Sequence, residues 1–585
     1  MHIQPCHARH LRHRRPNLPI RAEDLALAQA EAAPAGRLLQ ERLPEIQVPG
    51  TWQPRRLNLW CLRRETTGFI LTIQGHDVLL EASLRREFVA GAGRLLALLR
   101  AAADQQRELP QGRWEETPRY PIRLHYLPGH FGNSFEVAWP GEMRRYLGDL
   151  AFWGASGYAD WFDPNDMPDP YRPQVYCSTS MTLWQRKKEV LRLAQELGLD
   201  LALAVTHNVG FTDQMRPEWV GVRSHQHRVQ GQVLCPSIPE ARQVCLRNHE
   251  NLLRDLAEAG IRIDKLIYAP YDDGGCACER CQPYYATFLG MVTQIHEMAR
   301  RYFPGVRADL CGWWVTDEEL RLVRSYVAGP ARDWFGSFQF SATYNVFALP
   351  DVRQSLGDLP LSTFFHLAFS HDARDVYIRT GLHAAPRRIQ SVIRSFAAQQ
   401  CLGFHSYNEG FGDHYNEFLA SQLARDPDAD VRQLTLDYGR QVFALRGPEL
   451  QQMVDVILDM EQLEGAKAAG WAATLRRLSR RVRTPPRQAW AFAQVALKAE
   501  LMALDHQIGS GESWQSPADL APLAKAIAQR LSLSETLWRD VYGLGVLRHI
   551  FIPARMLPPW HDHYLRVCPP PPDRIRPGSA VSQQA

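Results

Sequence analysis

The middle of the chain alternates short apolar runs with amphipathic segments, and this alternation constrains the fold more than any other feature. The apolar runs lie at 122–127, 152–158, 199–206, 266–271, 308–313, 334–340, 363–369 and 402–407. Between them, segments such as 183–197, 240–259, 284–302, 318–327 and 387–399 show the 3.6-residue spacing of helices. Eight is the number of parallel strands that closes a barrel, so the pattern predicts an α/β fold, a (β/α)8 TIM barrel over 120–427.

A chain of 585 residues is too long for one core, so further domains are expected on both sides of the barrel. Residues 22–119 predict a small α/β domain with a hairpin at 68–82 that turns at Gly75. Residues 428–565 contain only long amphipathic stretches and predict an α-helical domain. The basic segment 1–21 and the proline-rich segment 566–585 are expected to be disordered tails.

Composition excludes several classes of partner. The formal charge of +4 is small, and no basic run interleaved with aromatic residues occurs in the interior, which argues against nucleic acid. No apolar stretch reaches membrane-spanning length, and none near the N-terminus fits a signal peptide. Eleven cysteines without an even framework of spacings favour a reducing compartment. We therefore expect a cytoplasmic protein without a membrane partner.

Ionisable, amide and aromatic residues follow the apolar runs, where a barrel places its active site. Rings stack on the C–H faces of a sugar while amides and carboxylates bond its hydroxyls, so a carbohydrate substrate is predicted. The candidate substrate-binding residues are His130, Trp161, His207, Asn208, Trp313, Trp314, Tyr344, Asn345, His371 and Asn408. The two histidine pairs, His207-Asn208 and His371-Asp372, are alternatively loop residues that bond only to the protein.

Three carboxylates at these positions are the candidate catalytic residues. Asp272 and Asp273 follow the fourth run, and Glu409 follows the eighth. Cleavage of a glycoside needs one carboxyl that protonates the leaving oxygen and a second group that stabilises the oxocarbenium-like centre. The glycines after Asp273 allow the strand to end between the two acids, although a capped turn would explain the same residues.

Three cysteines follow the acids: Cys276, Cys278 and Cys281. Reduced cysteines that pack the loop, with no metal, are the expectation. The alternative is a structural zinc with a fourth ligand from Cys235 or Cys311.

Several motifs resemble the β-N-acetylhexosaminidase-like glycoside hydrolases, in particular bacterial barrels with an Asp-x-Gly-Gly-x-Cys-x-Cys-x-x-Cys-type loop. The resemblance covers about 22–427. It rests on segments 68–73, 88–96, 114–123 and 408–416, the last followed by Asp426-Pro427, and on the loop Asp272-Asp273-Gly274-Gly275-Cys276-Ala277-Cys278-Glu279-Arg280-Cys281. It implies that Asp272 orients the substrate's 2-acetamido group, which attacks the anomeric carbon, and that Asp273 is the general acid and then base. It also implies that Trp313, Trp314 and Tyr344 line the sugar subsite.

The chain also departs from that pattern. Its acid pair is Asp-Asp where hexosaminidases usually have Asp-Glu, and segment 124–130 has no counterpart of their sugar-binding arginine. In the cysteine-loop relatives only the first acid is regularly matched, which leaves Asp272 with Glu409 as an alternative pair. The predicted function is glycoside hydrolysis of an N-acetylhexosaminide or related sugar without a cofactor. The competing functions are a carbohydrate-binding barrel without turnover and a metal-dependent hydrolase that uses the cysteine loop.

Overall fold

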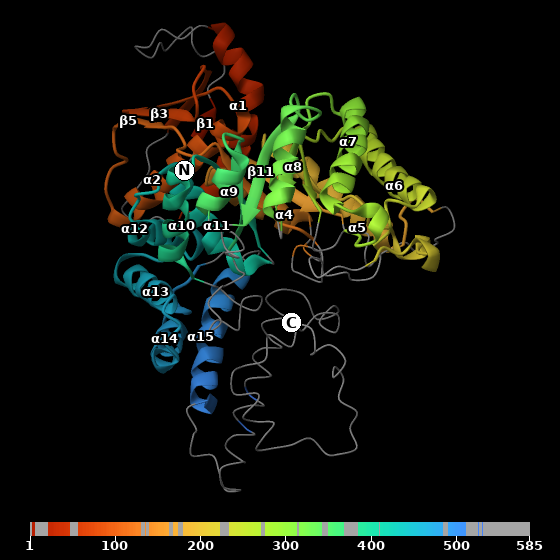
Figure 1. Cartoon of the computed structure of the whole chain (residues 1–585). Coiled ribbons are helices and arrows are strands. Elements are labelled where there is room, and N and C mark those ends of the chain that lie inside the picture. The colour runs from red at the N-terminus through yellow and green to blue at the C-terminus, as the bar shows by residue number, and fades with distance from the viewer. Residues whose placement is uncertain are drawn as a thin grey trace, which may run out of the picture.

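The computed structural model describes residues 3–5, 22–46, 57–129, 135, 138, 140–162, 168–172, 179–222, 233–270, 275–312, 315–341, 349–367, 384–408, 410–483, 489–509, 525 and 529. These residues form a small sheet domain, a closed barrel and a group of C-terminal helices (Figure 1). The sheet domain and the C-terminal helices lie on the same side of the barrel.

The small domain is a five-stranded sheet in the order β1-β2-β4-β3-β5, packed against two helices. Its strands are β1 (Ile3–Pro5), β2 (Leu57–Arg63), β3 (Phe69–Gln74), β4 (Asp77–Ala82) and β5 (Gly112–Glu116), and its helices are α1 (Ala22–Arg42) and α2 (Arg85–Gln105). The predicted hairpin is β3 and β4, and its turn contains Gly75 at φ +60°. Strand β1 lies within segment 1–21 and pairs in parallel with β2.

The barrel closes in the order β6 to β13, with every neighbouring pair parallel, which confirms the predicted (β/α)8 fold. Its strands are β6 (Ile122–Tyr126), β7 (Gly157–Trp161), β8 (Asp200–Thr206), β9 (Lys265–Ala269), β10 (Arg307–Cys311), β11 (Phe335–Ser341), β12 (Leu361–His366) and β13 (Cys401–Tyr407). Each apolar run overlaps one of these strands. The runs are apolar throughout because both faces of a barrel strand are covered.

The second strand lies further along the chain than its apolar run suggests. Phe152 ends the preceding helix, and Trp153 and the positive-φ Gly154 turn the chain toward the strand. Asp160 and Trp161 therefore lie within β7 instead of following it.

Helices cover the outside of the barrel. They are α4 (Pro140–Phe152), α5 (Thr179–Glu196), α6 (Pro239–Glu258), α7 (Tyr284–Tyr302), α8 (Asp317–Ala328), α9 (Leu349–Leu356), α10 (Pro386–Ala398) and α11 (His414–Arg425). The sequence pattern located five of them, whereas α4, α9 and α11 were not predicted.

An ion-paired group fills the barrel lumen below the strand ends. Asp309 of β10 is fully buried, and its carboxylate lies 2.7 Å from Lys265 Nζ of β9 and 3.2 Å from His405 Nε2 of β13. Burial alone would raise the pKa of Asp309, but Lys265 and His405 hold it below its ordinary value. Side chains from three strands thus meet inside the barrel.

Gly403 closes the barrel between its last and first strands. It pairs with Ile122 of β6 and has φ +134°. A Cβ at this position would lie 1.9 Å from the Ile122 carbonyl oxygen, so only glycine lets the two strands approach.

The described C-terminal helices are α12 (Val431–Val442), α13 (Gly447–Met460), α14 (Gly465–Leu478) and α15 (Ala489–Gly509). Helix α12 contacts α2 of the small domain, and α14 packs along α15. At the start of α15, the Trp490 ring stacks on Phe411 with 4.8 Å between centroids. Phe411 lies two residues after Glu409 in sequence, so this helix contacts the segment that follows the eighth barrel strand.

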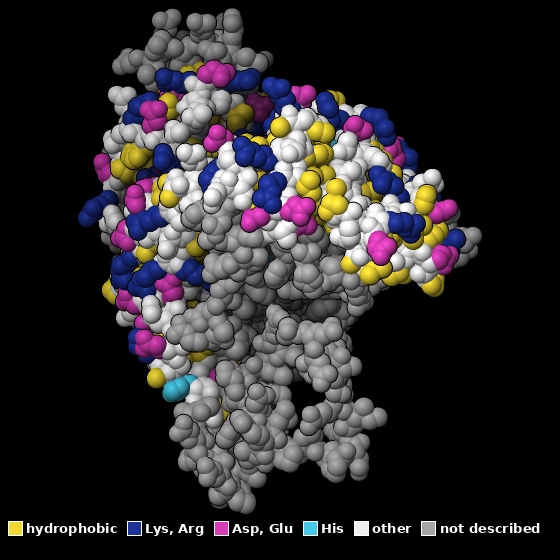
Figure 2. Space-filling view, viewed as in Figure 1, with side chains coloured by type: hydrophobic (Ala, Val, Ile, Leu, Met, Phe, Trp, Pro, Cys, Tyr) yellow, Lys and Arg dark blue, Asp and Glu magenta, His cyan; other side chains and the backbone are white. Residues whose placement is uncertain are grey.

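Basic and acidic side chains are interspersed over the described surface seen in Figure 2. Among the described residues, no helix combines the length and the apolar character that a bilayer-spanning helix needs.

Candidate functional site at the strand ends

The barrel brings the ends of β9 and β13 to the same face. These strands are the fourth and eighth of the closed ring, so they stand opposite one another across the lumen and point in the same direction. In sequence, Asp272 and Asp273 follow β9 and Glu409 follows β13. The predicted residues His130, Asp272, Asp273, Trp313, Trp314, Tyr344, Asn345, His371 and Glu409 lie outside the described residues. The described residues next to them in the chain show how the segments that carry them are held.

Asn208 ties two loops together at the end of β8. Its Nδ2 donates to Gly275 O at 3.0 Å and to Leu234 O at 2.8 Å, and its Oδ1 accepts from Gly275 N at 3.1 Å. Asn208 is fully buried. Gly275 lies two residues after Asp273, so these bonds fix the chain just beyond the acid pair. The contact of Asn208 with substrate stays a prediction.

His207 is a buried neutral imidazole beside Asn208. Its Nε2 lies 2.5 Å from Tyr284 Oη, and its ring packs edge-on against Phe288. Burial, with a smaller contribution from His249, lowers the pKa of His207 to about 3. The side chain therefore carries no charge at neutral pH and cannot serve there as a cationic group.

Asn408 fixes the chain on either side of Glu409. Its Oδ1 accepts from Gly410 N at 3.2 Å, and its Nδ2 donates to the carboxylate of Glu417 on α11. Tyr146 of α4 donates to the other oxygen of Glu417, and all three side chains are buried. Burial first, and then the Glu417 charge, raises the pKa of Tyr146 well above its usual value. The chain at the end of the eighth strand is thus held by a buried carboxylate of α11.

Asp160 fixes the chain that follows the first barrel strand, β6. Its Oδ1 accepts from Gly129 N at 3.1 Å and from Trp161 N at 2.7 Å, and Lys187 Nζ lies 2.8 Å from the same oxygen. Gly129 directly precedes His130. A buried polar side chain therefore anchors the segments next to three of the predicted site residues: His130, Asp273 and Glu409.

Aromatic rings line the lumen above the Asp309 group, and most of them were not predicted from the sequence as site residues. Trp161 belongs to a cluster inside the barrel that also contains Tyr126 and Phe364, with Tyr407 packed against it. The Tyr126 and Tyr407 centroids lie 5.6 Å apart, and the His366 centroid lies 4.7 Å from that of Tyr407. Tyr126, Trp161, His366 and Tyr407 are the last residues of strands β6, β7, β12 and β13. They form the layer of the lumen nearest the strand ends.

The three loop cysteines meet a fourth, Cys235, which precedes α6. The four sulfur atoms all lie within 4.8 Å of one another. Cys235 Sγ is 3.7 Å from both Cys278 Sγ and Cys281 Sγ. The hydrogen bond from the Cys281 thiol lowers the pKa of Cys276 to about 5, whereas burial raises the pKa of Cys235 to about 11. Cys311, the other candidate partner, belongs to the lumen cluster instead.

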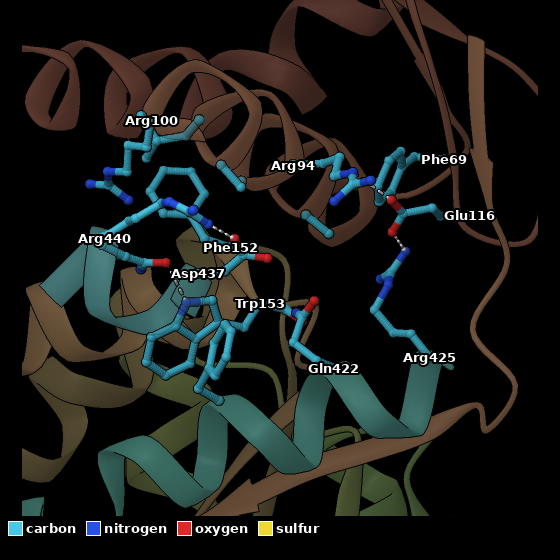
Figure 3. A pocket seen from close by; sticks show the side chains of 16 residues that line it. Phe69, Arg94, Arg100, Glu116, Phe152, Trp153, Gln422, Arg425, Asp437 and Arg440 are labelled. Carbon is cyan, nitrogen blue, oxygen red and sulfur yellow. Dashed lines mark hydrogen bonds and ion pairs between the residues drawn. The ribbon is translucent and has the colours of Figure 1, made fainter. Parts of the chain in front are cut away.

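A separate cavity of about 50 Å³ lies between the small domain, α4, α11 and α12 (Figure 3). Barrel helices run opposite to the strands, so the C-terminal ends of α4 and α11 that line it mark the face away from the strand ends. Arg94 and Arg425 both pair with Glu116 there, at 3.1 and 3.3 Å (Figure 3). The cavity has room for only a few water molecules, and its arginines are paired with acids. It is part of the domain junction.

The fold and the strand-end arrangement define the class: a (β/α)8-barrel protein with a small sheet domain before the barrel and helices after it. A scan of known protein families finds no match to the sequence, and a search of curated proteins finds none either.

Solved structures share the fold at low sequence identity. A family 138 glycoside hydrolase that targets the pectin rhamnogalacturonan II superposes with a TM-score of 0.51 and 10% identity, over 89% of this chain and 69% of that one. The family 89 glycoside hydrolase from Clostridium perfringens, in complex with PUGNAc, gives a TM-score of 0.58 and 10% identity over 87% of this chain and 65% of that one. A variant of that enzyme in complex with its substrate GlcNAc-α-1,4-galactose gives 0.56 at the same identity and coverage. The chain thus spans about two thirds of the length of these glycoside hydrolases, and the likeness establishes the fold.

Proposed function

We propose that the chain is a glycoside hydrolase that acts on an N-acetylhexosaminide or a related sugar. The observation that carries the proposal is the position of β9 and β13 on opposite sides of a closed parallel barrel. An acid after β9 and an acid after β13 would reach a bound sugar from opposite sides, which suits the pair Asp272 and Glu409. The pair Asp272 and Asp273 requires only that the chain after β9 opens onto the same face of the barrel. Aromatic rings from β6, β7, β12 and β13 form the layer nearest the strand ends, and aromatic rings are the side chains that stack on a sugar.

In this proposal Asp272 orients the acetamido group and Asp273 donates the proton to the leaving oxygen. Asp272 with Glu409 is the second assignment. The shared fold with glycoside hydrolases supports the reaction class, and the N-acetylated ligands of the family 89 enzyme support the choice of sugar. Because the substrate named for that enzyme is α-linked, both anomers belong in the test.

The experiment measures turnover of α- and β-linked aryl N-acetylhexosaminides and hexosides by the wild type and by Asp272→Asn, Asp273→Asn and Glu409→Gln. Loss of a general acid or base costs roughly 10²- to 10⁴-fold. Asp358→Asn is the control, because it removes an exposed acid between α9 and β12, at the opposite face.

Leaving-group dependence separates the two assignments. If Asp273 is the proton donor, Asp273→Asn retains most activity on substrates with acidic phenol leaving groups and loses it on poor ones. If Glu409 is the donor, Glu409→Gln behaves in that way instead. The anomeric configuration of the first product, read by NMR, distinguishes retention from inversion. A wild type that turns over none of these substrates would contradict the proposal, and binding of the same sugars without turnover would favour the carbohydrate-binding alternative.

A further inference from the structure

The cysteine cluster joins two loops of the barrel, one after β8 and one after β9. Cys235 lies beside the two isolated bridges Val209 to Val233 and Val220 to Leu234, which bring the end of the β8 loop back to the barrel. The other three cysteines lie between β9 and α7. Cys235, Cys276 and Cys281 are buried, and Cys278 is partly exposed.

The spacing of the sulfur atoms matches a single tetrahedral metal ion. A zinc–sulfur bond of about 2.3 Å sets the edge of a ZnS₄ tetrahedron at about 3.8 Å. Cys235 Sγ lies 3.7 Å from two of its partners, and no pair in the cluster is more than 4.8 Å apart. A disulfide needs about 2.05 Å, and all four cysteines are free.

The polar groups around the sulfurs suit thiolates. Val222 N donates to Cys276 Sγ at 3.4 Å, and Ser237 Oγ lies 2.9 Å from Cys281 Sγ. Hydrogen-bond donors of this kind stabilise the charge of metal-bound sulfur.

We propose that Cys235, Cys276, Cys278 and Cys281 bind one Zn²⁺ ion. Four soft ligands in a tetrahedron of this size favour zinc among the common divalent ions. All four positions are occupied by protein sulfur, so no site remains for a water molecule and the ion has a structural role. The metal-dependent hydrolase considered from the sequence would need an open position.

The zinc ion adds to the tie that Asn208 already makes. Asn208 bonds to Leu234 and Gly275, the residues directly before Cys235 and Cys276. The ion would therefore fix the loop that starts immediately after the acid pair. The proposal that the cluster binds zinc does not depend on the proposed glycosidase activity. Only the effect of the zinc ion on catalysis depends on that activity.

The first test is the zinc content of the full chain, purified without a metal-binding tag or chelator and measured by elemental analysis. We expect about one zinc per chain in the wild type and less than a fifth of that in Cys235→Ala and Cys278→Ala. Cys278 is the most exposed of the four, so its variant carries the smallest risk of folding failure. Cys245→Ala is the matched control, because Cys245 is a buried thiol on α6 outside the cluster. Histidines at 2, 7, 10 and 13 remain in every variant, so metal lost with the cysteines reports the cluster alone.

The second test exchanges zinc for Co²⁺, whose absorption reports its ligands. Wild type and Cys245→Ala should show the thiolate-to-cobalt charge-transfer band and tetrahedral visible bands, and Cys278→Ala should lose most of the charge-transfer intensity. A wild type with less than a tenth of an equivalent of zinc and no such bands overturns the proposal. So does iron in place of zinc, or equal metal loss in Cys245→Ala. These readouts hold whether or not the chain hydrolyses a glycoside.

Discussion

Asn208 and Gly275 bond to each other in both directions. The amide nitrogen of Asn208 donates to the Gly275 carbonyl at 3.0 Å, and its amide oxygen accepts from the Gly275 N–H at 3.1 Å. The Asn208 side chain, at the end of β8, thereby makes the two hydrogen bonds that a neighbouring strand would make with the chain beyond β9. Gly275 follows Asp273 by two residues in sequence, and this leads to the first prediction.

Asn208→Ala should lower both stability and turnover. It leaves backbone groups of Gly275 and Leu234 without partners, which costs about 1–3 kcal/mol in the free energy of unfolding. Displacement of the acid pair should reduce kcat on the best aryl glycoside about tenfold or more. Denaturant titration and steady-state kinetics measure the two effects.

The control is Asn248→Ala. Asn248 and Gln214 also exchange two amide hydrogen bonds, at 2.7 and 2.9 Å, and neither bond involves the chain beyond β9. This variant should lose similar stability but keep kcat. If both variants keep full turnover, Asn208 has no positioning role.

Trp490→Ala should reduce turnover although Trp490 belongs to a C-terminal helix. Its ring stacks on Phe411, which follows Glu409 by two residues, and also lies edge-on to His414 at 5.3 Å. Loss of the ring should displace this segment and lower kcat, with a stability loss of about 1–3 kcal/mol for a partly buried aromatic. Trp471→Ala, in α14, removes a more buried ring that bonds to Asp459. It should destabilise the chain at least as much and leave kcat unchanged at temperatures where both variants are folded.

Gly403→Ala should destabilise the barrel by about 3 kcal/mol or more, because the new methyl group would overlap the Ile122 carbonyl and φ is positive. Gly290→Ala provides the contrast. Gly290 lies within α7, and no atom lies within 4 Å of the position that its Cβ would take, so alanine should stabilise the helix by about 0.5–1 kcal/mol. Urea midpoints of the two variants should move in opposite directions. An unchanged midpoint for Gly403→Ala would show that β13 and β6 adjust to the side chain.

His207 should make stability fall in mild acid. Its folded pKa is about 3, against about 6.5 for an unfolded imidazole. Between these values the unfolded chain binds a proton that the folded chain excludes, so stability decreases as pH falls from 6.5 toward 3. The stability difference between wild type and His207→Gln should therefore change by about 2–3 kcal/mol between pH 7 and pH 4.5, in favour of the variant.

The sequence located the barrel because each of its strands is covered on both faces and reads as an apolar run. Because both faces of each strand are apolar, the sequence does not distinguish inward-pointing from outward-pointing residues. Tyr126, Phe364 and Tyr407 were therefore not recognised as lumen residues. The predicted position of the second strand was too early in the chain. The apolar end of α4, at Phe152, continues into the turn before β7 without a polar residue to mark the boundary.

The cysteine cluster shows a different limit. The spacing of Cys276, Cys278 and Cys281 indicated a group of three, but the fourth member lies 41 residues upstream of Cys276. Two cysteines were possible partners, and the loop after β8 brings back Cys235. The spacing of nearby cysteines does not predict which distant cysteine the fold brings next to them. The role of Asn208 was likewise out of reach, because its partners are backbone atoms of two other segments.

Among the described residues, the buried ion-paired group around Asp309 and the rings above it fill the barrel interior, so this part of the chain leaves no passage along the axis. Whatever reaches the strand ends must enter and depart through the same mouth. A long polysaccharide could present a terminus or lie across the rim, but it could not be threaded. Released product and incoming substrate would then share one route, and accumulating product should slow turnover by occupying it.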